Sequence, residues 1–135
     1  EPIQFCIRAG KKKLSVATDL GFVSSLVEYC LRDSNLVVIE SNHDVEMLKR
    51  GPYPWELKQR ILSRTGHLSN RNAAELLFNL FKQQPMRAVL AHLSEENNHP
   101  DIAEKEVHDL FENYDVHIPA LTVAHQDSPT SILEI

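Results

Sequence analysis

The sequence is poor in glycine and cysteine, contains no long apolar run and has no excess of positive charge. With four glycines and no glycine-rich loop after a predicted strand, a nucleotide-binding α/β module is disfavoured. No apolar run approaches the roughly 18 residues needed to span a bilayer, and no signal peptide precedes the first predicted strand. We therefore expect a cytoplasmic protein without a membrane partner.

The charge balance is acidic. Fourteen Lys and Arg stand against 19 Asp and Glu, which gives a net charge of −5 at pH 7. This balance provides no general attraction to nucleic acid or membranes, although a local basic patch remains compatible with it. The run from Lys11 to Lys13 is expected at a solvated hairpin turn.

The two cysteines, Cys6 and Cys30, have neither metal-ligand spacing nor the pattern of a disulfide framework. Cys6 falls in a strand-like run, and Cys30 falls on the apolar side of a predicted helix. We therefore expect two reduced, buried thiols.

The length and composition fit one soluble globular domain. At 135 residues, with 42% apolar and 24% charged residues, the chain can bury a substantial core. It begins at Glu1 without Met and enters a predicted strand almost at once, so we expect it to be a piece of a longer polypeptide.

Apolar periodicity and turn residues predict alternating strands and helices. Strands are predicted at residues 3–8, 13–18, 36–39, 87–91 and 119–125. Helices are predicted at about 23–31, 45–50, 55–64, 70–84 and 100–114, and the tail 127–135 is expected to hold a further short strand. This order predicts an α/β fold, a mixed sheet covered by helices whose first two strands form an antiparallel hairpin.

Three predicted strands run directly into a polar side chain: Asp19, Glu40 and His92. In open α/β sheets, ligands bind outside the carboxyl ends of the strands. Carboxylates and imidazoles are the groups that ligate metals or move protons, so a site is predicted there. The structural alternatives are a helix cap for Asp19, a surface or cap-pairing role for Glu40 and a loop hydrogen bond for His92.

A second polar segment, the Gly-His-Leu-Ser loop with His67 and Ser69, enters a predicted helix. Backbone N–H groups and the positive helix end there favour a phosphate, which His67 could protonate; a plain cap is the alternative. The setting of His43 suits either a ligand cluster or a helix entry. Asn97 and Asn98 are candidates for substrate contact or for ordering their loop. The remaining histidines are expected to be surface or structural residues: His99, His108, His117 and His125.

These spacings alone contain no self-sufficient signature, but five strings resemble a known family. They are ATDLG (17–21), VIESNHD (38–44), GPYPWELKQRI (51–61), GHLSN (66–70) and AHLSEENNHP (91–100). Together they resemble the C-terminal half of metallo-β-lactamase-fold hydrolases of the YycJ/WalJ type, which are related to tRNase Z and RNase J.

The resemblance implies residue roles. Asp19 matches the aspartate that bridges two metal ions, and His92 matches the last histidine ligand of the second metal. Glu40 and His67 are similar in position to the pair that protonates the leaving group. The loop with Ser69 is similar to a phosphate-contacting loop.

The resemblance also implies half of an αββα sandwich, with residues 1–135 as the C-terminal half of the domain. The implied function is metal-dependent hydrolysis of phosphodiester bonds, in DNA or RNA, with two Zn or Mn ions in the complete site. The family's His-x-His-x-Asp-His motif is absent from residues 1–135, so the isolated chain is expected to bind metal weakly and to be inactive. The alternative is a metal-free half-domain that pairs with a second copy, as a homodimer, or with another partner.

Overall fold

The computed structural model describes residues 3–82 and 84–135, and it has the predicted order of elements. The strands are β1 (Phe5–Ala9), β2 (Lys12–Ala17), β3 (Leu36–Glu40), β4 (Arg87–Ala91) and β5 (Ala120–Val123). The helices are α1 (Ser25–Leu31), α2 (Val45–Arg50), α3 (Trp55–Ile61), α4 (Asn70–Phe81) and α5 (Pro100–Asn113). The prediction for α4 extended to Gln84 and included Gln83, which lies outside the described residues.

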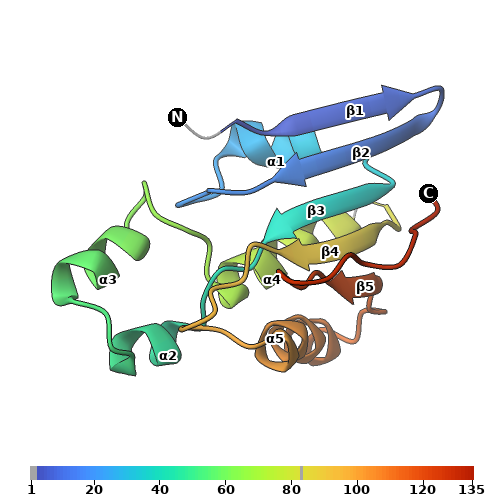
Figure 1. Cartoon of the computed structure of the whole chain (residues 1–135). Coiled ribbons are helices and arrows are strands. Elements are labelled where there is room, and N and C mark those ends of the chain that lie inside the picture. The colour runs from blue at the N-terminus through green and yellow to red at the C-terminus, as the bar shows by residue number, and fades with distance from the viewer. Residues whose placement is uncertain (1–2, 83) are drawn as a thin grey trace.

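All five strands belong to one mixed sheet, in the order β1-β2-β3-β4-β5 (Figure 1). β1 and β2 form the antiparallel hairpin, and β2, β3, β4 and β5 are parallel. Because parallel strands end at the same edge, the segments that follow β2, β3 and β4 come together there. The predicted fold class, a mixed sheet covered by helices, is confirmed.

The core lies between the sheet and the helices α1, α4 and α5 (Figure 1). The two central strands β3 and β4 are almost entirely buried, as their unbroken apolar runs predict. α4 buries most of its length, and Phe78 and Phe81 on it pack edge-to-face against Phe111 of α5. This rigid support fixes the positions of the strand ends.

The other face of the sheet is partly open. The side chains of Phe5 and Ile7 on β1 are 57% and 56% exposed. The segment after β5 runs back along the sheet (Figure 1). Glu134 and Ile135, at the end of this segment, line a hollow beside the start of β4. The described tail residues 127–135 contain no strand, so the prediction of a further strand there is wrong.

Two predictions about side-chain burial are also wrong. Cys6 and Cys30 are exposed, because β1 is an edge strand and Cys30 lies on the outer side of α1. Lys13, expected in a solvated turn, is buried. Its ammonium donates hydrogen bonds of 2.5 Å and 2.6 Å to the carbonyls of Cys30 and Arg32, and so satisfies the C-terminal end of α1.

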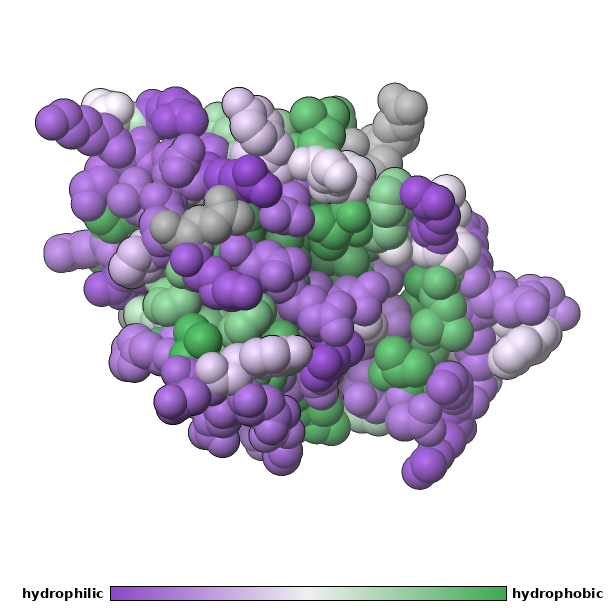
Figure 2. All heavy atoms as spheres, turned by 180° about the vertical axis from the view of Figure 1, so that it is seen from behind, coloured by the Kyte–Doolittle hydropathy of each residue, from purple (hydrophilic) through white to green (hydrophobic). Residues whose placement is uncertain are grey.

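The helices α2 and α3 form an arm that extends from the sheet on the side of its carboxyl edge (Figure 1). Lys58 of α3 is buried and donates to the carbonyls of Lys49 and Gly51 at the end of α2, which ties the two helices together. Seen from behind, the mostly hydrophilic surface is interrupted by apolar groups on the side of this arm (Figure 2). The exposed apolar side chains of α3 and the residue after it are Trp55, Leu57 and Leu62.

Within the described residues, every helix is too short or too polar to cross a membrane.

Candidate metal centre

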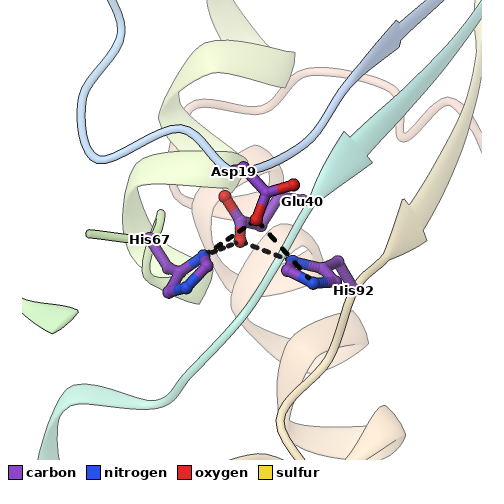
Figure 3. Close-up of side chains that lie close together, drawn as sticks. All are labelled: Asp19, Glu40, His67 and His92. Atoms are coloured by element: carbon purple, nitrogen blue, oxygen red, sulfur yellow. Dashed lines mark hydrogen bonds and ion pairs between the residues drawn. The ribbon is translucent and has the colours of Figure 1, made fainter. Parts of the chain in front are cut away.

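Four of the predicted site residues converge at the carboxyl edge of the sheet: Asp19, Glu40, His67 and His92 (Figure 3). Asp19 follows β2, Glu40 is the last residue of β3, and His92 follows β4. His67 comes from the loop that enters α4. Each residue offers one ligand atom, and these atoms lie within 4.8 Å of one another.

Glu40 is the centre of this cluster, and its side chain is fully buried. One carboxylate oxygen, Oε1, accepts from Nδ1 of His67 at 2.6 Å and from Nδ1 of His92 at 2.8 Å. The other, Oε2, accepts from the backbone N–H groups of Leu20 and Leu68 at 2.8 Å and 3.3 Å. A carboxylate acceptor requires a proton on each Nδ1, so the Nε2 atoms of both rings are left for other partners.

The two imidazoles face Asp19 differently. Nε2 of His92 lies 4.0 Å from Oδ1 of Asp19, whereas His67 turns Nδ1 toward the same oxygen at 3.8 Å. Zn²⁺ binds nitrogen and oxygen ligands at about 2.0–2.2 Å, so a separation of 4.0 Å allows one ion to contact both Asp19 and His92. An exposed carboxylate facing a free imidazole nitrogen is a donor set that fits a divalent cation.

Asp19 and His92 both have left-handed backbone conformations, with φ of 58° and 57°. Such conformations are uncommon for residues other than glycine and persist only where the surroundings hold them. The amide of Asn42 donates to the carbonyl of His92 at 2.9 Å. The backbone of Asn42 also donates to Leu68 and accepts from Ser94, so the three loops around the cluster are tied together.

The other predicted contact residues have local partners. Ser69 accepts from the backbone of Asn72 as the N-cap of α4. The amide of Asn98 donates to Ser41 and Asn70. Asn97 is buried, and its Oδ1 has no hydrogen-bond partner within the described residues. Ser69, Asn97 and Asn98 are not among the described residues that line the two hollows beside the cluster, so their contact with substrate stays a prediction.

His43 lies just before Asp44, the N-cap of α2, and does not belong to the four-residue cluster. Its ring is buried, and neither nitrogen has a hydrogen-bond partner within the described residues. Burial and the nearby His67 lower the pKa of His43 to about 4, against a smaller opposing effect of Asp44. The ring is therefore neutral at pH 7.

A hollow of about 940 Å³ opens beside the cluster. Its lining includes Asn42, Tyr53 and His125, to which the sequence argument gave no role in the site. Asn42 could have been predicted as a site residue, because it lies two positions after Glu40 at the end of β3. Tyr53 could not, because it lines the hollow only through the position of the arm.

The fold and the cluster together define an α/β chain with a carboxylate–imidazole centre at the carboxyl edge of a mixed sheet. The chain is 39% identical over 112 residues to the exodeoxyribonuclease YycJ of Bacillus anthracis, which covers 83% of this chain and 42% of YycJ. It is 42% identical over 92 residues to the exodeoxyribonuclease WalJ of Streptococcus pneumoniae strain D39, which covers 68% of this chain and 34% of WalJ. The predicted resemblance is confirmed, and the chain is a YycJ/WalJ-like relative within the metallo-β-lactamase-fold hydrolases.

The chain thus spans less than half of the length of these curated relatives. A solved structure described as a new diphosphatase from the PhnP family has a TM-score of 0.45 and 12% identity, over 89% of this chain and 34% of that protein. No family model matches the chain.

Proposed function

We propose that this chain provides part of the active site of a metal-dependent hydrolase that cleaves phosphodiester bonds in nucleic acid. The observation that carries the proposal is the convergence of Asp19, Glu40, His67 and His92 at the sheet edge. The relatives YycJ and WalJ are both named exodeoxyribonucleases, which supports DNA as the substrate.

Asp19 and His92 are the proposed metal ligands. Nε2 of His92 is the ring nitrogen free of Glu40, and it faces the exposed carboxylate of Asp19. A bound divalent cation supplies a Lewis acid that polarises a phosphoryl oxygen and acidifies water. Carboxylate and imidazole ligands suit both Zn and Mn, and the choice between them stays open.

Glu40 and His67 are proposed to handle the proton. The hydrogen bond from Nδ1 of His67 to Glu40 fixes the ring and leaves Nε2 to face a substrate. A protonated His67 can then give the Nε2 proton to the leaving oxygen when the bond between phosphorus and oxygen breaks. Glu40 cannot itself reach bulk solvent, because its side chain is fully buried.

We further propose that residues 1–135 form the C-terminal half of the domain, and that a first half supplies the other metal ligands. Catalytic zinc sites usually have three protein ligands, and Asp19 and His92 provide two. The open face of the sheet, with Phe5 and Ile7 on β1, is the surface that such a half would cover. Two proposed ligands per chain also imply low metal affinity for the isolated chain.

The same open face favours one second candidate, an inactive half-domain that pairs with another copy of this chain. Exposed apolar side chains on an edge strand promote pairing. Light scattering of the purified chain separates the two possibilities, because a stable monomer contradicts the pairing function.

Hydrolysis tests the main proposal. The natural full-length polypeptide, supplied with Zn²⁺ or Mn²⁺, is assayed on bis(4-nitrophenyl) phosphate and on end-labelled DNA. We expect His67→Gln to lower kcat by about 10²–10⁴-fold while metal content stays the same. We expect Asp19→Ala to lose metal and activity together. A fully active Asp19→Ala protein would overturn the proposal, and Asp109→Ala, on α5 and outside the cluster, is the matched control.

A further inference from the structure

Two hollows meet at the four-residue cluster. The larger, of about 940 Å³, is lined by Tyr53, Glu95 and Glu96 among others. The smaller, of about 610 Å³, is lined by Arg60, Thr65 and Gly66 among others. Asp19, Leu57, Ile61 and His67 line both hollows, so the cluster lies at their junction. A phosphate held at the cluster therefore has room for a substituent on each side.

The two hollows differ in charge. Glu95 and Glu96 are exposed in the loop after β4 and border the larger hollow. Arg60 borders the smaller hollow and is exposed. Carboxylates repel the phosphates of a nucleic-acid strand, and guanidinium groups attract them. The strand is therefore expected to extend from the cluster along the smaller hollow and not along the larger one.

The larger hollow also has the chemistry that a nucleobase requires. Tyr53, Leu57 and Ile61 of the arm provide an aromatic and apolar wall, and Ser94 and Gln126 provide polar groups for hydrogen bonds. Bases stack on aromatic side chains with about 1–3 kcal/mol per base, and this stacking needs no positive charge. An uncharged nucleoside therefore fits where the phosphates are repelled.

We propose that the larger hollow receives the terminal nucleoside of a nucleic-acid strand, stacked on Tyr53, and that the phosphates of the following nucleotides lie along Arg60. This inference rests on the proposed phosphodiesterase function and adds the orientation in which the strand lies across the site. Glu95 at one end and Arg60 at the other would give a bound strand one orientation across the site.

Binding of oligonucleotides tests this placement. The full-length polypeptide is titrated into single-stranded DNA that carries a fluorophore in mid-strand. Three such DNAs are compared: one with intact ends, one with an abasic nucleotide at the 5′ end and one with an abasic nucleotide at the 3′ end. We expect one of the abasic ends to weaken binding by roughly fivefold or more. Tyr53→Ala should remove that difference and Tyr53→Phe should keep it. Trp55→Ala, which changes an exposed aromatic residue outside the hollow, is the control and should also keep it.

Charge provides the second measurement on the same DNA. Arg60→Gln should lower the slope of log affinity against log salt by about one, whereas Glu95→Gln should not lower it. The inference is overturned if the wild-type protein does not distinguish intact from abasic ends, if Tyr53→Ala still does, or if Arg60→Gln leaves the slope unchanged. Hydrolysis of bis(4-nitrophenyl) phosphate, which has no nucleoside, reports separately on the proposed function.

Discussion

At the scale of the residue, the site depends on one buried carboxylate. Glu40 accepts from two imidazoles and from two backbone N–H groups, so a single side chain sets the orientation of His67 and His92. Glu40 also accepts a hydrogen bond from the backbone N–H of Leu20, the residue after Asp19. The position of Asp19 therefore also depends on Glu40. We therefore expect Glu40 to affect the proposed metal binding through the residues that it orients.

The variant Glu40→Gln tests this role. An amide replaces one oxygen acceptor by an NH₂ donor, which must then face either two backbone N–H groups or the two ring nitrogens. We predict a loss of metal affinity of about 10–100-fold, together with a lower melting temperature. Isothermal titration with Zn²⁺ and thermal unfolding measure both, and Glu104→Gln on the exposed side of α5 is the control. An unchanged affinity would contradict the orienting role.

His43 gives the protein a pH dependence of its own. Its folded pKa of about 4 lies below the ordinary value of 6.5, so the unfolded chain takes up the proton first as the pH falls. Stability is therefore complete above pH 6.5 and declines between pH 6.5 and about 4, by about 3 kcal/mol at most, since one pKa unit is about 1.4 kcal/mol.

Urea unfolding from pH 7 to pH 4 measures this decline. We predict that His43→Gln flattens it and that His117→Gln, at an exposed position, does not. Equal slopes for the wild-type protein and His43→Gln would show that another group titrates in this range.

At the scale of the element, the site is assembled by three strand ends and the loops that follow them. Asn42 ties the loop after β3 to the carbonyl of His92 after β4, where φ is 57°. We predict that Asn42→Ala and the isosteric Asn42→Asp, which has no N–H to donate, both weaken Zn²⁺ binding by at least about threefold, since a lost hydrogen bond is about 1 kcal/mol. If Asn42→Asp binds as tightly as the wild-type protein, the hydrogen bond does not position His92.

The arm formed by α2 and α3 depends on Lys58. Its buried ammonium donates to two carbonyls at the end of α2. We predict that Lys58→Met loses about 1–3 kcal/mol of local stability, because both carbonyls lose their charged donor. Hydrogen exchange of α2 and α3 should rise while that of β3 and β4 does not. Lys49→Met, on the exposed side of α2, is the control for the charge.

The elements themselves could be predicted from the sequence because their apolar patterns are strong. The apolar runs of β3 and β4 predicted these two strands. Glu40 and His92 were predicted as strand-end groups because each comes directly after one of these runs. The exposure of Cys6 could not be predicted, because its apolar surroundings in sequence do not show that β1 lies at an edge. The burial of Lys13 depends on the end of α1, which is distant in sequence.

At the scale of the whole molecule, one face of the sheet is covered by helices and the other face is partly open. The helices cover the first, and β1 exposes Phe5 and Ile7 on the second. The match to less than half of YycJ and WalJ is consistent with a proposed first half that packs there. The predicted cytoplasmic location and the number of metal ions stay predictions at this scale.

The most direct measurement is a metal-affinity titration of the full-length polypeptide and its Asp19→Ala and His92→Ala variants with Zn²⁺ and Mn²⁺. Asp109→Ala and His108→Ala, at half-buried positions on α5 outside the four-residue cluster, are the matched controls. We predict that both site variants bind metal at least about tenfold more weakly while their melting temperatures without metal stay within a few degrees of the wild-type value. Metal affinities equal to those of the controls would show that Asp19 and His92 are not ligands and would contradict the proposed hydrolase.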